Sequence, residues 1–340
     1  EYDKALQELN FTAKKLQENS FLQKNQILKI KPQLEIKKMK GNQILPNNEF
    51  INYKFNVGES VSLRNAFGMA SSNLAKKYDN FDMFDADLKG GTSTETFEKH
   101  FPSRFIQCGI AEQNMFSAAA GYYLATGRIP VVTTYAVFAS MLGAAQFRNG
   151  VALQKLPYIV VASHVGIDVG QDGPTHQAIE DIGIYSSYPG IQILSPCDAN
   201  RVQAVFEAAL LSKKPTYMRT GRSPVPVIYP TDSKYTIGKD TVLHEGNDIS
   251  IFATNRMVHK AIEARESLKE QNISAEIVDI TSIVPLDEET IIKSVKKTGC
   301  AVTVEDHSVR NGLGGKIAQN ISEKYPVKIK NVGIKKYAES

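Results

Sequence analysis

Residues 104–115, Arg-Phe-Ile-Gln-Cys-Gly-Ile-Ala-Glu-Gln-Asn-Met, join a short strand to a helix. The apolar residues of 104–108 predict a short buried strand, and 114–126 is an Ala-rich helix, so Glu112 falls at the turn between them. If the helix is already wound at Glu112, the residues three, four and seven positions later share its face (Met115, Phe116 and Ala119). Burial on that face would favour a neutral carboxyl able to donate a proton. The alternative is an exposed glutamate that the helix dipole favours in the first turn.

The chain around this stretch alternates between strands and helices. We expect helices at 62–77, 136–153 and 198–211, and strands at 81–84, 129–135, 157–162, 191–194 and 216–218. This alternation predicts a parallel, doubly wound sheet. Ligands of such sheets bind at the carboxyl ends of the strands, where the candidate site residues below are found.

A second α/β unit follows residues 221–248, which contain three prolines and little periodicity and so indicate a domain connection. Its expected strands are 249–253, 275–280 and 301–305, and its expected helices are 257–271, 287–297 and 313–322. The predicted fold class is therefore α/β, with two doubly wound domains of mainly parallel sheets at 55–220 and 249–340. Residues 1–54 are rich in lysine, and we expect a helix at 2–16 followed by a linker.

Composition narrows the class of protein. The 340 residues favour two domains, and 42% hydrophobic with 22% charged residues is ordinary for a soluble globular protein. A net charge of +4 is too weak to indicate nucleic-acid binding. The three cysteines, Cys108, Cys197 and Cys300, are far apart and odd in number, which favours a reduced, cytoplasmic setting. No apolar stretch approaches the roughly 18 residues of a membrane span, and no secretion signal is expected.

Two stretches resemble the transketolase family of thiamine diphosphate enzymes: 103–115 and 163–177, the latter Ser-His-Val-Gly-Ile-Asp-Val-Gly-Gln-Asp-Gly-Pro-Thr-His-Gln. The resemblance extends over roughly 55–340 and implies a pyrimidine-binding domain followed by the family's C-terminal domain. Its implied cofactor-binding residues are Glu112, Tyr135, Phe138, Met141 and Asp87. By resemblance, Glu112 hydrogen-bonds the aminopyrimidine ring of the cofactor, and the aromatic side chains cover that ring. Met141 stands where many relatives carry an aromatic residue. The alternative for the aromatic residues Tyr135 and Phe138 is simple core packing, and the alternative for Asp87 is an acidic residue in a turn.

The same resemblance implies the residues that bind the substrate. His164, Asp172 and His176 would face the hydroxyls and carbonyl of a sugar, with His164 and His176 catalytic, because imidazole transfers protons near neutral pH. Arg64 and Arg219 match positions that hold the substrate phosphate, which suits a guanidinium group. From the residues alone, 164–176 is a turn-rich loop or a metal site, and its histidines lack the short spacing typical of zinc. We expect no metal ligands in this chain.

One part of the family pattern is missing. The family binds the cofactor diphosphate through Mg²⁺, which is held by a Gly-Asp-Gly run and a later asparagine, and this chain contains no Gly-Asp-Gly. The other half of the site is therefore expected from a diphosphate-binding domain elsewhere. Residues 1–9 resemble the tail of that domain, so the chain looks like a carboxyl-terminal part cut at both ends; a separate subunit of a split enzyme is the alternative. The family also implies a homodimer with sites at the interface.

Three functions follow from these observations. The first is transketolase, which transfers a two-carbon ketol unit between sugar phosphates in the pentose phosphate pathway. The second is a related thiamine enzyme, either deoxyxylulose-phosphate synthase or the β subunit of a 2-oxoacid dehydrogenase. The third is a non-catalytic fragment or partner subunit. Ser163-His164 and residues 173–177 favour transketolase, and we expect the chain to be inactive without the diphosphate-binding domain.

Overall fold

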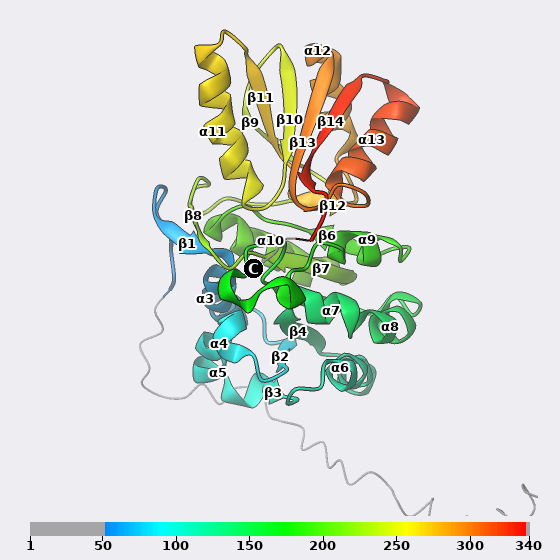
Figure 1. Ribbon diagram of the computed structural model, residues 1–340. Helices are drawn as coiled ribbons and strands as arrows, with labels where there is room; N and C mark the ends of the chain where they lie inside the picture. The colour runs from blue at the N-terminus through cyan, green and yellow to red at the C-terminus, as the bar shows by residue number, and fades with distance from the viewer. Residues whose placement is uncertain (1–51, 338–340) are drawn as a thin grey trace, which may run out of the picture. The chain divides into compact units, whose positions relative to one another are not determined.

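The computed structural model describes residues 52–337, which form two helix-flanked sheets and one small two-stranded sheet (Figure 1). The helix expected at 2–16 and the segment 1–9 lie outside the described residues. The small sheet pairs β1, Ser60–Ser62, with β8, Pro224–Pro226, in antiparallel fashion.

The first sheet has seven strands in the order β12-β6-β7-β5-β4-β2-β3. Neighbouring strands are parallel, except that β12 runs antiparallel to β6. Because β12 comes from the second half of the described chain, it joins that half to the first sheet. The strands are β2 (Phe81–Asp85), β3 (Phe105–Gln107), β4 (Ile129–Tyr135), β5 (Tyr158–Ser163), β6 (Gln192–Leu194), β7 (Pro215–Thr220) and β12 (Ser282–Val284).

Helices cover both faces of this sheet. Neighbouring strand residues belong to different cores: Val131 packs with Phe67 and Phe206 of α3 and α10, whereas Val132 packs with Phe116 of α6. Burial on both faces explains why apolar residues dominate the central strands β4 and β5. Side chains of Ser62 and Asp198 cap the first turns of α3 and α10. The helices are α3 (Leu63–Lys77), α4 (Lys89–Thr92), α5 (Glu95–His100), α6 (Glu112–Thr126), α7 (Ala136–Met141), α8 (Ala144–Phe147), α9 (Asp181–Ser186) and α10 (Ala199–Ser212).

The second sheet has five strands in the order β14-β13-β10-β11-β9. Its strands are parallel except β9, which runs antiparallel to β11. Its elements are β9 (Thr241–His244), β10 (Ile249–Ala253), α11 (Met257–Glu270), β11 (Ala275–Asp279), α12 (Glu288–Thr298), β13 (Cys300–Ser308), α13 (Leu313–Lys324) and β14 (Lys328–Ile334). The predicted class, two α/β units with mainly parallel sheets, is confirmed.

Some elements differ from their prediction. The helix expected at 136–153 is divided into α7, α8 and a π-helical turn, Arg148–Ala152. The division occurs at Gly143, where an added Cβ would lie 2.7 Å from the Phe116 ring, so only glycine permits this close packing. Strand β3 is partly exposed because it lies at the edge of its sheet. Strands β9, β12 and β14 were not predicted. Among the helices within 52–337, none has both the length and the apolar character to cross a bilayer.

Candidate active site

Glu112 is the first residue of α6 and is buried, with 6% of its surface exposed. Met115, Phe116 and Ala119 are buried on the same helix face, as expected for a helix wound from Glu112 onward. The structure therefore excludes the exposed first-turn alternative. Thr134 on β4 donates a long hydrogen bond of 3.5 Å to Oε1 of Glu112. A carboxyl group has about four acceptor positions, so this one retains capacity for another partner.

Aromatic rings gather next to Thr134, where β4 and β5 end. Tyr135 and Phe138 are nearly parallel, with ring centroids 5.7 Å apart and an interplanar angle of 13°. The His164 ring lies 3.9 Å from Tyr135, and the His176 ring lies 5.4 Å from Phe138. Since β4 and β5 are parallel neighbours, their carboxyl ends bring these residues to one edge of the sheet.

His164 is held in an unusual backbone conformation. Its φ of 59° lies in the left-handed region, which residues other than glycine rarely adopt, and it is 2% exposed. The hydroxyl of Ser163 lies 3.0 Å from its Nδ1. Burial, together with the positive charges of Arg64 and Arg222, lowers the pKa of His164 to about 4. The imidazole is therefore neutral at physiological pH, with one nitrogen able to accept a proton.

Arg64, in the first turn of α3, reaches the same edge. Its Nη1 donates to the carbonyl oxygen of Gly91 at 2.8 Å. A Cβ on Gly91 would lie 2.2 Å from the Tyr135 hydroxyl, so glycine allows the two segments to touch. Arg64 is thus linked through Gly91 to the segment that contacts the Tyr135 ring, and its expected role at a substrate phosphate stays a prediction.

The loop 164–176 places Asp172 beside an arginine that we did not predict. Nη1 of Arg222 lies 3.8 Å from Oδ2 of Asp172 and donates to the carbonyl oxygen of Val169. Arg222 follows β7 and is partly exposed. The signal in the sequence was the pair of arginines at 219 and 222, but spacing does not tell which of the two reaches the surface.

The structure does not place Arg219 where a substrate phosphate would reach it. Arg219 is fully buried, and its Nε lies 2.8 Å from Oδ2 of Asp181. Asp306, on β13, lies 3.5 Å from Nη1 of Arg219. The expectation for Arg219 is corrected on this ground: its charge is already paired with carboxylates inside the protein. The partly exposed Arg222 lies two residues past the end of β7, beside Asp172 of the loop 164–176.

Asp87 and Met141 are the most exposed of the expected residues. Asp87 has a left-handed φ of 62°, and its backbone N–H donates to Gln107 at 2.8 Å. The buried carboxylate nearby is instead that of Asp85, which accepts from the backbone N–H of Leu88 and from threonine hydroxyls. Met141 is 50% exposed, and the apolar Ile110, two residues before Glu112, is 83% exposed. An exposed apolar side chain therefore stands close to Glu112 in the sequence.

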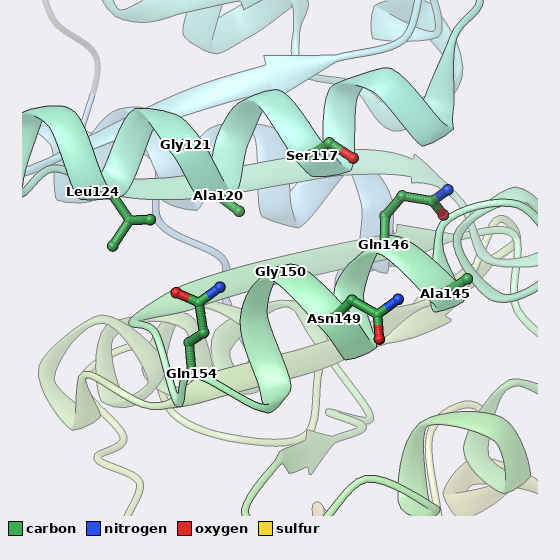
Figure 2. A pocket seen from close by; sticks show the side chains of 9 residues that line it. All are labelled: Ser117, Ala120, Gly121, Leu124, Ala145, Gln146, Asn149, Gly150 and Gln154. Carbon is green, nitrogen blue, oxygen red and sulfur yellow. The ribbon is translucent and has the colours of Figure 1, made fainter. Parts of the chain in front are cut away.

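A groove of about 370 Å³ runs between α6 and the helical segment from α8 to Ala152 (Figure 2). Figure 2 shows Leu124 opposite Gln154 at one end and Ser117 opposite Gln146 at the other. Four of the residues that line it are small, namely Ala120, Gly121, Ala145 and Gly150. Leu153, next to Gln154, is 65% exposed.

Metal-binding groups and disulfides are absent from the described part of the chain. Within 52–337, no three His, Cys, Asp or Glu side chains are grouped so as to hold a metal ion. Cys108, Cys197 and Cys300 are free thiols.

Comparison with known proteins gives a consistent result. The family model for the transketolase pyrimidine binding domain matches 59–228, and that for the transketolase C-terminal domain matches 238–340. A putative transketolase C-terminal section from Methanocaldococcus jannaschii is 42% identical over 78% of this chain and 83% of that protein. A 6-deoxy-6-sulfo-D-fructose transketolase subunit from Clostridium is 37% identical over 77% of this chain and 81% of that protein. The solved structure of a split gene transketolase, described as an inactive beta4 tetramer, superposes with a TM-score of 0.77 at 38% identity, covering 82% of this chain and 91% of that one.

Proposed function

The chain belongs to the transketolase family, and on that premise we propose that it is the subunit of a split transketolase that supplies the pyrimidine half of a thiamine diphosphate site. The reaction would be reversible transfer of a two-carbon ketol unit from a ketose phosphate to an aldose phosphate, as in the pentose phosphate pathway. The observation that carries the proposal is the buried Glu112 beside the ring group of Tyr135, Phe138 and His164.

The described residues fit the pyrimidine half of the cofactor. Glu112 offers a buried carboxyl with unused hydrogen-bonding capacity, and Tyr135 and Phe138 offer flat apolar surfaces next to it. Ile110, two residues before Glu112, and Met141, three residues after Phe138, are exposed apolar side chains that a second polypeptide would cover. We place Asp87 near the cofactor as part of the same proposal. Mg²⁺ and the diphosphate would be held by the other polypeptide.

When bound, thiamine diphosphate supplies a thiazolium carbon that becomes nucleophilic toward the ketose carbonyl. Glu112 would hold a proton against the aminopyrimidine nitrogen, and its burial strengthens that hydrogen bond. Tyr135 and Phe138 would exclude water from the ring. The chain's part is thus to bind, to orient and to hold one proton.

The loop residues would act on the sugar. His164 is neutral, so it accepts a proton or a hydroxyl hydrogen bond without carrying a competing charge. His176 and Asp172 lie on the same loop and would bind the hydroxyls. Arg64 and Arg222 provide the positive charge for a phosphate, in place of Arg64 and Arg219 as first expected.

The groove between α6 and α8 supports a proposal about assembly. A second copy of the chain, packing its own α6 here, would cover Leu124 and Leu153 and form a homodimer. The diphosphate-binding polypeptide would then complete each site. We propose a cytoplasmic enzyme, in keeping with three free thiols.

Reconstitution tests the proposed function. The chain, mixed with the diphosphate-binding polypeptide, Mg²⁺ and thiamine diphosphate, should transfer a ketol unit from a ketose phosphate to an aldose phosphate. Neither polypeptide should do so alone. Activity on pyruvate and glyceraldehyde phosphate instead would favour the related synthase, and a complex that binds cofactor without turnover would favour a non-catalytic partner.

A further inference from the structure

The second sheet brings charged side chains to the loop that carries His164, Asp172 and His176: Asp306 lies against Gly166, and Arg256 pairs with Asp168. Arg256 follows β10 and directly precedes α11. Its Nη1 lies 2.8 Å from Oδ1 of Asp168, whose side chain is 11% exposed. The Asp168 carboxylate is therefore largely shielded from solvent, and salt screens its attraction to Arg256 only weakly.

The electrostatic preference of a helix N-terminus does not explain the arginine at position 256. A positive charge at a helix N-terminus opposes the helix dipole, and the first turn of α11 holds no acidic residue to offset it. The preceding Asn255 is buried with a left-handed φ of 54°, and its side-chain amide donates to the carbonyl oxygens of Pro196 and Arg219. The chain is thus bent toward the first sheet just before Arg256. The partner that compensates for this arrangement is Asp168.

Asp168 connects Arg256 to the turn after β7. The backbone N–H of Ser223 donates to Oδ2 of Asp168 at 2.7 Å, and the Ser223 hydroxyl donates to Oδ1. The preceding residue is Arg222, which donates to Val169 in the loop and faces Asp172. A Cβ on Gly170 would lie 2.6 Å from Nη1 of Arg222, so the loop is folded closely around this guanidinium.

We propose that Arg256 is a positioning residue for the active site: through Asp168 it fixes the loop 164–176 and the Arg222 turn in the geometry that receives a phosphorylated substrate. Arg256 itself touches neither of the proposed catalytic histidines in the contacts described above. The inference rests on the proposed function, because it assigns the phosphate to Arg222. Catalytic geometry is sensitive to small displacements, so one distant contact can alter substrate binding.

The test uses Arg256→Gln, Arg256→Lys, Asp168→Asn and the Gln/Asn double variant in the reconstituted enzyme. Arg265→Gln is the matched control, because Arg265 lies on the same helix and pairs with Glu266. Hydrogen–deuterium exchange of the peptide covering 164–176 is measured on the chain, alongside KM and kcat for phosphorylated and unphosphorylated substrates. Exchange does not require turnover, so it decides the role of Arg256 even if the proposed reaction is absent.

Arg256→Gln should raise both the exchange rate of the loop and KM for phosphorylated substrates on the order of tenfold, the effect of losing one charge-assisted contact. Values of kcat and KM for unphosphorylated donors should change much less. Arg256→Lys should recover part of the loss, and the double variant should be no worse than the more impaired single variant. Unchanged exchange in Arg256→Gln, or the same change in Arg265→Gln, overturns the proposal. Faster exchange with no ketol transfer in the unmodified enzyme would overturn the proposed function and leave the positioning role intact.

Discussion

Replacing Glu112 with glutamine tests how the buried carboxyl acts. The amide has nearly the same shape, and its Oε1 still accepts from Thr134, so packing against Met115 and Phe116 is retained. We expect folding and cofactor affinity of the reconstituted enzyme to change little, by less than about 1 kcal/mol. The amide cannot release and regain the proton, however. Loss of one general acid–base group costs about 10²–10⁴-fold in rate, so turnover should fall by that range.

The assay for Glu112→Gln is proton–deuteron exchange at the thiazolium carbon, followed by NMR in the reconstituted enzyme. Exchange isolates cofactor activation from the later steps of sugar binding and release. Glu98→Gln is the matched control, because Glu98 is a partly exposed carboxylate paired with Lys89. An exchange rate in Glu112→Gln equal to that of the unmodified enzyme would refute the reasoning.

Three further predictions follow from the described contacts. Arg222→Ala should raise KM for phosphorylated sugars about 10- to 150-fold, the effect of roughly 1.5–3 kcal/mol, with little effect on hydroxypyruvate; equal losses on both would make Arg222 structural. Burial raises the pKa of Asp306 to about 6, whereas an aspartate in the unfolded chain has a pKa of roughly 3.9. Between about pH 4 and pH 6 the folded state therefore binds a proton at Asp306 that the unfolded state has released. As a result, this group lowers the free energy of unfolding as the pH rises through that range. The free energy of unfolding in urea, measured at about pH 4 and pH 6, should depend less on pH in Asp306→Asn than in the unmodified chain. The same pH dependence in both proteins would contradict this prediction. A Cβ at Gly121 would meet nothing within 4 Å, and in Gly121→Gln the rest of the side chain would extend into the groove, so light scattering should show dissociation, unlike the control Ala264→Gln at an exposed position of α11; an unchanged mass would exclude this surface.

The main elements of both sheets were predictable because periodicity and apolar runs are local signals. Residues 129–135 were expected as a strand and form β4 with the same bounds. The face of α6 on which Glu112 lies was also predictable, because helical spacing alone places Glu112 on the same face as Met115 and Phe116. The short strand β12 was not predictable, because it has three residues and is stabilised by pairing with the distant β6.

The choice of the arginine that we propose for phosphate binding could not be made from the sequence. Arg219 and Arg222 are three residues apart, and from the sequence either could be the partner of an anion; in the structure Arg219 belongs to β7 and Arg222 lies two residues past the end of that strand. Their difference arises from tertiary contacts: Asp181 on α9 and Asp306 on β13 pair with Arg219, whereas Arg222 lies beside the loop that holds Asp172. Contacts between residues so far apart in sequence leave no periodic signal. The role of Arg256 was hidden for the same reason, since Asp168 lies far from it along the chain.

The central claim is that this chain holds one half of a thiamine diphosphate site. Calorimetric titration of the chain alone with thiamine diphosphate and Mg²⁺ tests it most directly. We predict weak or undetectable binding and no ketol transfer, because the described residues offer a pyrimidine surface but no grouped ligands for the metal that would hold the diphosphate. Micromolar affinity together with ketol transfer by the isolated chain would contradict the account.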